Sequence, residues 1–128
     1  RMSKIDELYA ILKAKREHVA TFGAAEMGAA VRRTCMLAEG ETRTLALAFD
    51  GNQLAGGLVI TSGETDRARE VVAVAGRHPE TVIRINAKML SEALAAAGEG
   101  ASLLFGEGLD PVHVVSPGFL AVIMPQRG

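Results

Sequence analysis

The chain has 128 residues, 48% of them hydrophobic, which suits one globular domain with a single core and excludes a disordered chain. Its formal net charge is -1, so no global basic field can hold nucleic acid, and a histone-like binder is excluded. Cys35 is the single cysteine, which excludes an internal disulfide and fits a reducing cytoplasm, where we expect the protein to reside.

Residues 1–17 form the first predicted segment, an amphipathic helix or a linker. Apolar side chains recur there at helical spacing behind Ser3, a suitable N-cap residue. These apolar positions are Ile5, Leu8, Tyr9 and Leu12. We expect the segment to precede a single domain over residues 18–128.

The first half of that domain is predicted from hydrophobic periodicity and turn residues. The expected elements are a strand at 18–22, a helix at 24–38 and strands at 42–49, 53–61 and 69–75. Asp50-Gly51-Asn52 is the expected turn between the second and third strands. The core face of the helix is expected to carry Met27, Ala30, Val31, Thr34 and Cys35.

The second half repeats the same plan. The expected elements are a strand at 81–85, a helix at 86–97 and strands near 101–105, 111–115 and 119–124. The core face of this helix is expected to carry Met89, Leu90, Ala93, Leu94 and Ala97. Each half therefore reads β-α-β-β-β. Two helices packed on antiparallel sheet give the α+β class.

No residue pattern predicts catalysis or a bound metal. His18, His78 and His113 are far apart, and none has the spacing of a metal ligand. No serine lies in a G-x-S-x-G elbow, and Cys35 lies on the core face of its helix. The two Gly-Glu-Gly segments place carboxylates where a phosphate cradle needs bare amides. We expect no active site, no cofactor and no metal.

The chain ends in an apolar strand that stops abruptly. Residues 120–124 are apolar, and Pro125 removes a backbone donor and ends the ladder of hydrogen bonds. Gln126 and Arg127 are then expected to leave the sheet edge as a short ordered tail, which can place residues beside a surface groove. The alternative is a terminal core strand with a proline stop.

Three motifs resemble those of the bacterial DNA polymerase III beta subunit, the sliding clamp. Residues 122–127, Val-Ile-Met-Pro-Gln-Arg, resemble its C-terminal V-I-M-P-x-R signature. Residues 82–94 resemble its x-F-N-x-x-Y-L-x-D-A-L element, and residues 30–37 resemble its A-h-x-R-x-x-h-L helix. Their order and spacing are close to those of the clamp's third, C-terminal domain. The resemblance implies a duplicated DNA-clamp fold without an active site.

The resemblance also implies partners and site residues. The expected partners are peptides of the DNA polymerase and its clamp loader, duplex DNA and further copies of the chain in a homo-oligomeric ring. The implied partner-peptide groove consists of Val122, Met124, Pro125, Gln126 and Arg127. The implied subunit interface contains Met36 and Leu37, which in the alternative interpretation complete the core.

Cations on the two helices are the candidates for a DNA contact. Arg32 and Arg33 lie opposite the core face of the first helix, and Lys88 lies opposite that of the second. Glu92 follows Lys88 by four residues and partly neutralises it. The resemblance implies that these helices line a central hole and touch the duplex backbone without reading bases. The alternative is an ordinary exposed helix face.

The chain also departs from the clamp family. A complete clamp chain has three such domains and this chain has one, so we expect either an excised third domain or a stand-alone relative. Gln126 stands where the family commonly has methionine, and Gly128 where it commonly has leucine. The linker residues that shape the family's groove have no clear counterparts. The alternative function is a stand-alone clamp-fold interaction protein that self-associates without encircling DNA.

Overall fold

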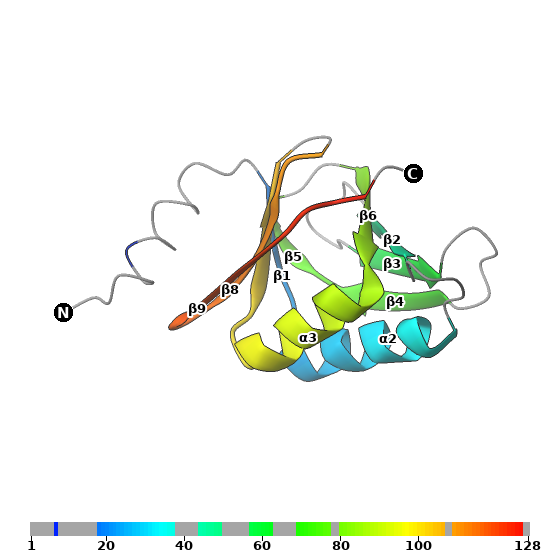
Figure 1. Ribbon diagram of the computed structural model, residues 1–128, viewed down its shortest axis with the longest axis horizontal. Coiled ribbons are helices and arrows are strands. Elements are labelled where there is room, and N and C mark those ends of the chain that lie inside the picture. Colours follow the sequence, from blue (N-terminus) through cyan, green and yellow to red (C-terminus); the bar gives the residue numbers. More distant parts are fainter. Residues whose placement is uncertain are drawn as a thin grey trace.

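The computed structural model describes residues 7, 18–37, 44–49, 57–62, 69–77, 80–106 and 109–126. Within these residues, two helices pack with nine strands (Figure 1). The helices are α2 (Ala24–Leu37) and α3 (Ala87–Ala97). The strands are β1 (His18–Thr21), β2 (Thr44–Phe49), β3 (Gly57–Ser62), β4 (Arg69–Ala73), β5 (Ala75–Arg77), β6 (Thr81–Asn86), β7 (Ser102–Phe105), β8 (Val112–Ser116) and β9 (Phe119–Ile123).

The predicted order of elements is confirmed, except that one predicted strand is divided into two. The single strand expected at 69–75 is instead two strands, β4 and β5, which belong to different sheets. The chain crosses between the sheets at Val74, and Gly76 then takes a φ of +121°. A Cβ atom at Gly76 would overlap the backbone oxygen of Val19, so glycine allows the close approach of β5 to β1.

The two halves of the chain exchange their first strands. The five-stranded sheet has the order β5-β1-β7-β8-β9, and the four-stranded sheet has the order β4-β3-β2-β6. β1, from the first half, pairs antiparallel with β7, and β6, from the second half, pairs antiparallel with β2. Neither half has a complete sheet of its own, so the two repeats form one domain.

The core lies between the helices and the two sheets. α2 and α3 pack side by side, with α2 on β3 and β4 and α3 on β6, β8 and β9 (Figure 1). The rings of Phe49 and Phe105 stack with centroids 4.8 Å apart, and these residues belong to different sheets. The sheets therefore share one hydrophobic cluster beneath the helices.

Hydrogen bonds cap α3 at both ends. The backbone N–H of Met89 donates to Asn86 Oδ1 at 2.9 Å, which is an N-cap bond. At the other end Gly98 N–H donates to the carbonyl oxygen of Leu94 at 3.1 Å, and Ser116 Oγ donates to that of Ala97 at 2.8 Å. The last bond ties the end of α3 to β8.

One core assignment in α3 is wrong. Met89 was expected on the core face, yet its side chain is 57% exposed, whereas Ala87, Leu90, Ala93 and Leu94 are buried. Successive helical residues are about 100° apart, so Met89 lies well to one side of Leu90. The sheets cover only the face that carries these four buried residues, and Met89 falls outside it.

Several expectations fall on residues that the structure does not describe. The amphipathic helix expected at 5–12 lies outside the described residues except for Glu7, which is helical and exposed. His78, Arg127, Gly128 and the turn at 50–52 also lie outside them. Leu37 ends α2, but its side chain is not described. None of the described helices is long and apolar enough to cross a bilayer.

Candidate functional site

The last strand, β9, has one face in the core and one in solvent. Ile123 is 5% exposed and packs in the core, whereas Val122 is 55% exposed and Met124, just past the strand, is 59% exposed. Leu120, on the same outer face, packs against a small cluster formed by Val19, Leu104 and Val115. The outer face therefore carries two exposed apolar side chains, while the inner face belongs to the core.

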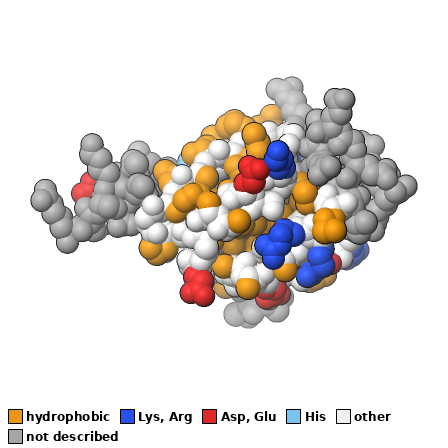
Figure 2. Space-filling model, turned by 60° about the horizontal axis from the view of Figure 1, so that its bottom comes forward, with side chains coloured by type: hydrophobic (Ala, Val, Ile, Leu, Met, Phe, Trp, Pro, Cys, Tyr) orange, Lys and Arg blue, Asp and Glu red, His pale blue; other side chains and the backbone are white. Residues whose placement is uncertain are grey.

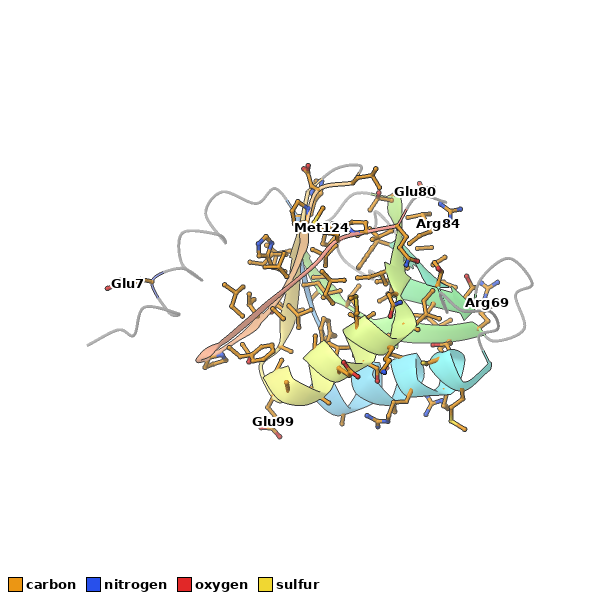
Figure 3. All side chains as sticks on the ribbon, viewed as in Figure 1. Glu7, Arg69, Glu80, Arg84, Glu99 and Met124 are labelled. Carbon is orange, nitrogen blue, oxygen red and sulfur yellow. The ribbon has the colours of Figure 1, made fainter. Side chains whose placement is uncertain are left out.

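The tail after β9 crosses to the other sheet. Gln126 N–H donates to the carbonyl oxygen of Arg84 in β6 at 2.8 Å, and the hydroxyl of Thr44 in β2 donates to Gln126 Oε1. Figure 3 shows Met124 on the β9 side of this crossing and Arg84 on the β6 side. Two hydrogen bonds, one to the backbone and one to the side chain, thus hold Gln126 on the second sheet, so Met124 lies between β9 and a residue that is bonded to β6 and β2.

Met89 adds a third exposed apolar side chain near this crossing. It lies in the first turn of α3, directly after Asn86, and Asn86 is the register partner of Thr44. The hydroxyl of Thr44 also donates to Gln126, so Thr44 is next to both the residue that caps α3 and the C-terminal tail. We call Met89, Val122 and Met124 the C-terminal patch.

Sequence reasoning missed Met89 because helical periodicity alone placed it in the core. A signal was available in the motif of residues 82–94, where Met89 stands at the tyrosine position. A tyrosine needs a polar partner when it is buried, so such a position favours the surface. His18 and His113 are not candidate residues for a surface site, because both are buried. The ring of His18 packs against that of Phe105.

Further exposed apolar side chains lie at the end of α2 and in the edge strand of the four-stranded sheet. Met36 is 82% exposed, which excludes the core role that was its alternative. β4 is an edge strand, α2 packs on it, and Val71 of β4 is 65% exposed. Val72 is buried and Glu70 pairs with Arg33 of α2, so the intervening Val71 points to the face of the sheet away from α2. Met36 and Val71 therefore flank the open edge of β4 from opposite faces, and we call the two residues with this edge the edge surface.

The expected DNA-facing cations are all on the surface. Arg32, Arg33 and Lys88 are exposed, and Figure 2, which looks onto the helices, shows cations as separate spots and not as a continuous basic area. Among the described residues no ion pair joins Lys88 to Glu92. The helix face therefore offers single positive charges, consistent with the low net charge.

Arg33 forms an ion pair with β4. Its Nη2 lies 2.6 Å from Oε1 of Glu70 and donates a hydrogen bond to it. This hydrogen bond and the opposite charges raise the pKa of Arg33 and lower the pKa of Glu70. The two side chains come from positions 37 residues apart in the chain.

The described residues contain no cluster of His, Cys, Asp and Glu suited to a metal ion. Cys35 is half-buried and packs against the core. The described surface offers apolar side chains at the C-terminal patch and the edge surface, and isolated cations on the helices.

No protein-family model matches the chain, and no curated protein matches it. Solved structures of bacterial sliding clamps do match. The Pseudomonas aeruginosa DNA polymerase III beta subunit is 19% identical with a TM-score of 0.78, covering 98% of this chain and 35% of that one. The Caulobacter crescentus beta subunit is 24% identical with a TM-score of 0.74, covering 89% of this chain and 31% of that one.

A Bartonella birtlesii sliding clamp bound to griselimycin has a TM-score of 0.74 at 14% identity, covering 98% of this chain and 35% of that one. The chain thus spans about a third of the length of the clamps that it matches. Identities this low show the fold, and the resemblance inferred from the three motifs is confirmed at that level.

Proposed function

We propose that this chain is a sliding-clamp domain, a non-enzymatic processivity module that acts in the cytoplasm. It binds peptides of replication partners at the C-terminal patch and contributes to a ring of domains around duplex DNA. The observation that carries the proposal is the placement of Val122 and Met124, exposed on a strand tied to the neighbouring sheet, within a chain that has the clamp fold.

The C-terminal patch suits the docking of a short apolar peptide. Peptide sites commonly bury a few apolar anchors inside a polar border. Val122 and the two methionines supply the apolar surface, and Gln126 and Arg127 are the proposed border. Methionine side chains are flexible and polarizable, so they adapt to different peptides. Pro125 and the bonds to Gln126 keep the patch ordered before a peptide arrives, which lowers the entropy cost of binding.

Methyl NMR of the methionines tests this docking directly. The probe is a short peptide rich in leucine and aromatic residues, taken from the clamp-binding segment of a bacterial polymerase. We expect the methyl signals of Met89 and Met124 to shift, and those of Met27, which is fully buried, and Met36, on the distant edge surface, to stay unchanged. Calorimetry of the same titration gives the affinity.

Met124→Ala is expected to weaken that binding by about 1–2 kcal/mol, the effect of removing a buried apolar anchor. Met36→Ala is the matched control, because it removes another exposed methionine, outside the C-terminal patch, and is expected to leave the affinity unchanged. Absence of heat together with unshifted Met124 signals would show that the patch is not a docking site.

The edge surface is the proposed site of self-assembly. An edge strand presents unpaired backbone donors and acceptors that pair readily with another strand. β4 offers such an edge, and Met36 and Val71 beside it are too exposed to belong to the core. Leu37 belongs to the same proposed interface by its position at the end of α2.

The helix face is the proposed DNA-facing side of the ring. The exposed cations of this face, with Arg32 and Lys88 free of an ion pair among the described residues, would contact phosphates without reading bases, because single cations on a helix carry no base information. Weak attraction to the phosphates suits a ring that must slide, because the closed ring, and not the binding affinity, keeps the protein on the DNA.

A further inference from the structure

Arg32 and Arg33 are neighbours in sequence and both exposed, yet their guanidinium groups go in different directions. Arg33 reaches off the helix to Glu70 in β4, with its Nη2 2.6 Å from the carboxylate oxygen. Arg32 runs back along α2 over Gly28, where its Nη1 lies 3.3 Å from the place that a Cβ atom would occupy. One arginine therefore stays on the helix face and the other is bound to the edge strand.

We infer that Arg33 is a positioning residue, which holds β4 ready for pairing with a second copy of this chain, while Arg32 supplies the DNA contact of α2. The inference rests on the proposed function and assigns different tasks within it to the two arginines. It also separates the residues that govern assembly from those that govern DNA binding.

The pair with Glu70 suits a positioning role because of where β4 lies. Among the described residues β4 has a strand neighbour, β3, on one side only, and Arg69, the first residue of β4, is the register partner of Thr61. Glu70 is the next residue, at the same end of the strand, and Arg33 fixes this end onto α2 (Figure 1). A strand that is ordered beforehand loses less conformational entropy when a second strand pairs with its edge.

The same pair makes Arg33 a poor DNA contact. Its guanidinium already donates to a carboxylate, and that carboxylate repels a phosphate brought beside it. A phosphate that approached Nη2 would have to compete with a charge-assisted hydrogen bond, which is stronger than a neutral one. Arg32 has no ion pair among the described residues, so its charge remains available for a phosphate.

Four variants separate the two tasks. Arg32→Ala removes the proposed DNA contact. Arg33→Ala and Glu70→Gln each break the ion pair, one from each side. Arg33→Glu combined with Glu70→Arg restores it with the charges reversed. Two measurements apply to all of them: analytical ultracentrifugation over a concentration series for assembly, and fluorescence anisotropy with duplex DNA over a salt series.

Arg32→Ala is expected to make the slope of log K against log salt shallower by about 1 and to leave assembly unchanged. Arg33→Ala and Glu70→Gln are expected to weaken assembly to a similar extent, with the salt slope unchanged. The charge reversal is expected to restore assembly, which a general loss of folding would not do.

The inference is overturned if Arg33→Ala reduces the salt slope as much as Arg32→Ala does while assembly is unchanged, or if the charge reversal fails to restore assembly. An unchanged slope in Arg32→Ala would refute the DNA contact but leave the role of Arg33 standing. If the chain is monomeric at every concentration, the pairing role and the proposed assembly both fail. Faster amide exchange in β4 of Arg33→Ala would then show that the pair still orders the strand.

Discussion

At the residue scale, the surroundings of a strand glycine decide whether it can be replaced by a residue with a side chain. Gly76 combines a φ of +121° with backbone contact to Val19, so both its conformation and its missing side chain are required. Gly57 lies in β3 with nothing within 4 Å of the place where a Cβ atom would stand. Two strand glycines of this chain thus have opposite tolerance for a methyl group.

Gly76→Ala is expected to destabilise the domain by at least about 1–3 kcal/mol, because the left-handed conformation is costly for alanine and the overlap with Val19 must also be relieved. Gly57→Ala is the matched control and is expected to change stability by less than about 1 kcal/mol. Urea unfolding followed by circular dichroism compares the two, and equal stability of both variants would refute the constraint.

The carboxyl group of Glu70 is expected to titrate below the usual range of a glutamate, because Arg33 lowers its pKa. A carboxylate whose pKa is lowered on folding contributes stability above its unfolded pKa, and that contribution is lost as the pH falls through the lowered pKa. Carboxyl-carbon NMR against pH measures the shift. Arg33→Ala should return the titration to the usual range, and Arg32→Ala should not change it.

At the element scale, α3 links the two sheets and the C-terminal patch. It follows β6 directly, packs on β8 and β9, and carries Met89 in its first turn. Its N-terminus depends on Asn86, since the first backbone donors of a helix have no partner within the helix. The position of Met89 therefore depends on an intact first turn.

Asn86→Ala is expected to destabilise the domain by about 1 kcal/mol through loss of the cap, while Asn86→Asp keeps an acceptor and retains most of the stability. Thermal unfolding of the two variants measures this. If both lose stability equally, the cap is not what Asn86 contributes.

At the scale of the whole molecule, the proposed assembly through the edge surface separates the two candidate functions. Among the described residues β4 has an open edge with Met36 beside it, and the proposed clamp-like ring would hold six such domains. A stand-alone interaction protein would instead form a monomer or a smaller oligomer.

Met36→Glu is expected to reduce the mass of the assembly without changing the circular dichroism spectrum, because a side chain that is 82% exposed can accept a charge without disturbing the core. Light scattering coupled to size exclusion measures the mass. Val122→Glu is the control, since it places the same charge on the C-terminal patch and should leave the mass unchanged. Unfolding of Met36→Glu would contradict its surface position.

The sequence by itself determined the elements of this protein and their order. Hydrophobic spacing marked α2 and the core of α3, alternation and turns marked the strands, and Pro125 marked the end of β9, because these signals depend on residues close together in the chain. The three motifs also led to the clamp fold. Arg32 and Lys88 were correctly placed on the surface by the same local reasoning, whereas the expectation for Met36 came from the resemblance.

Only the tertiary structure decided how distant segments meet. The exchange of β1 and β6 between the halves, the crossing at Val74, and the tail bonded to β6 all depend on contacts between residues far apart in sequence, which periodicity cannot report. The pairing of Arg33 with Glu70 joins positions 37 residues apart, and it distinguishes two adjacent arginines that are equivalent in sequence. Met89 is outside the core for the same reason, because the width of a helix's buried face is set by what packs against it.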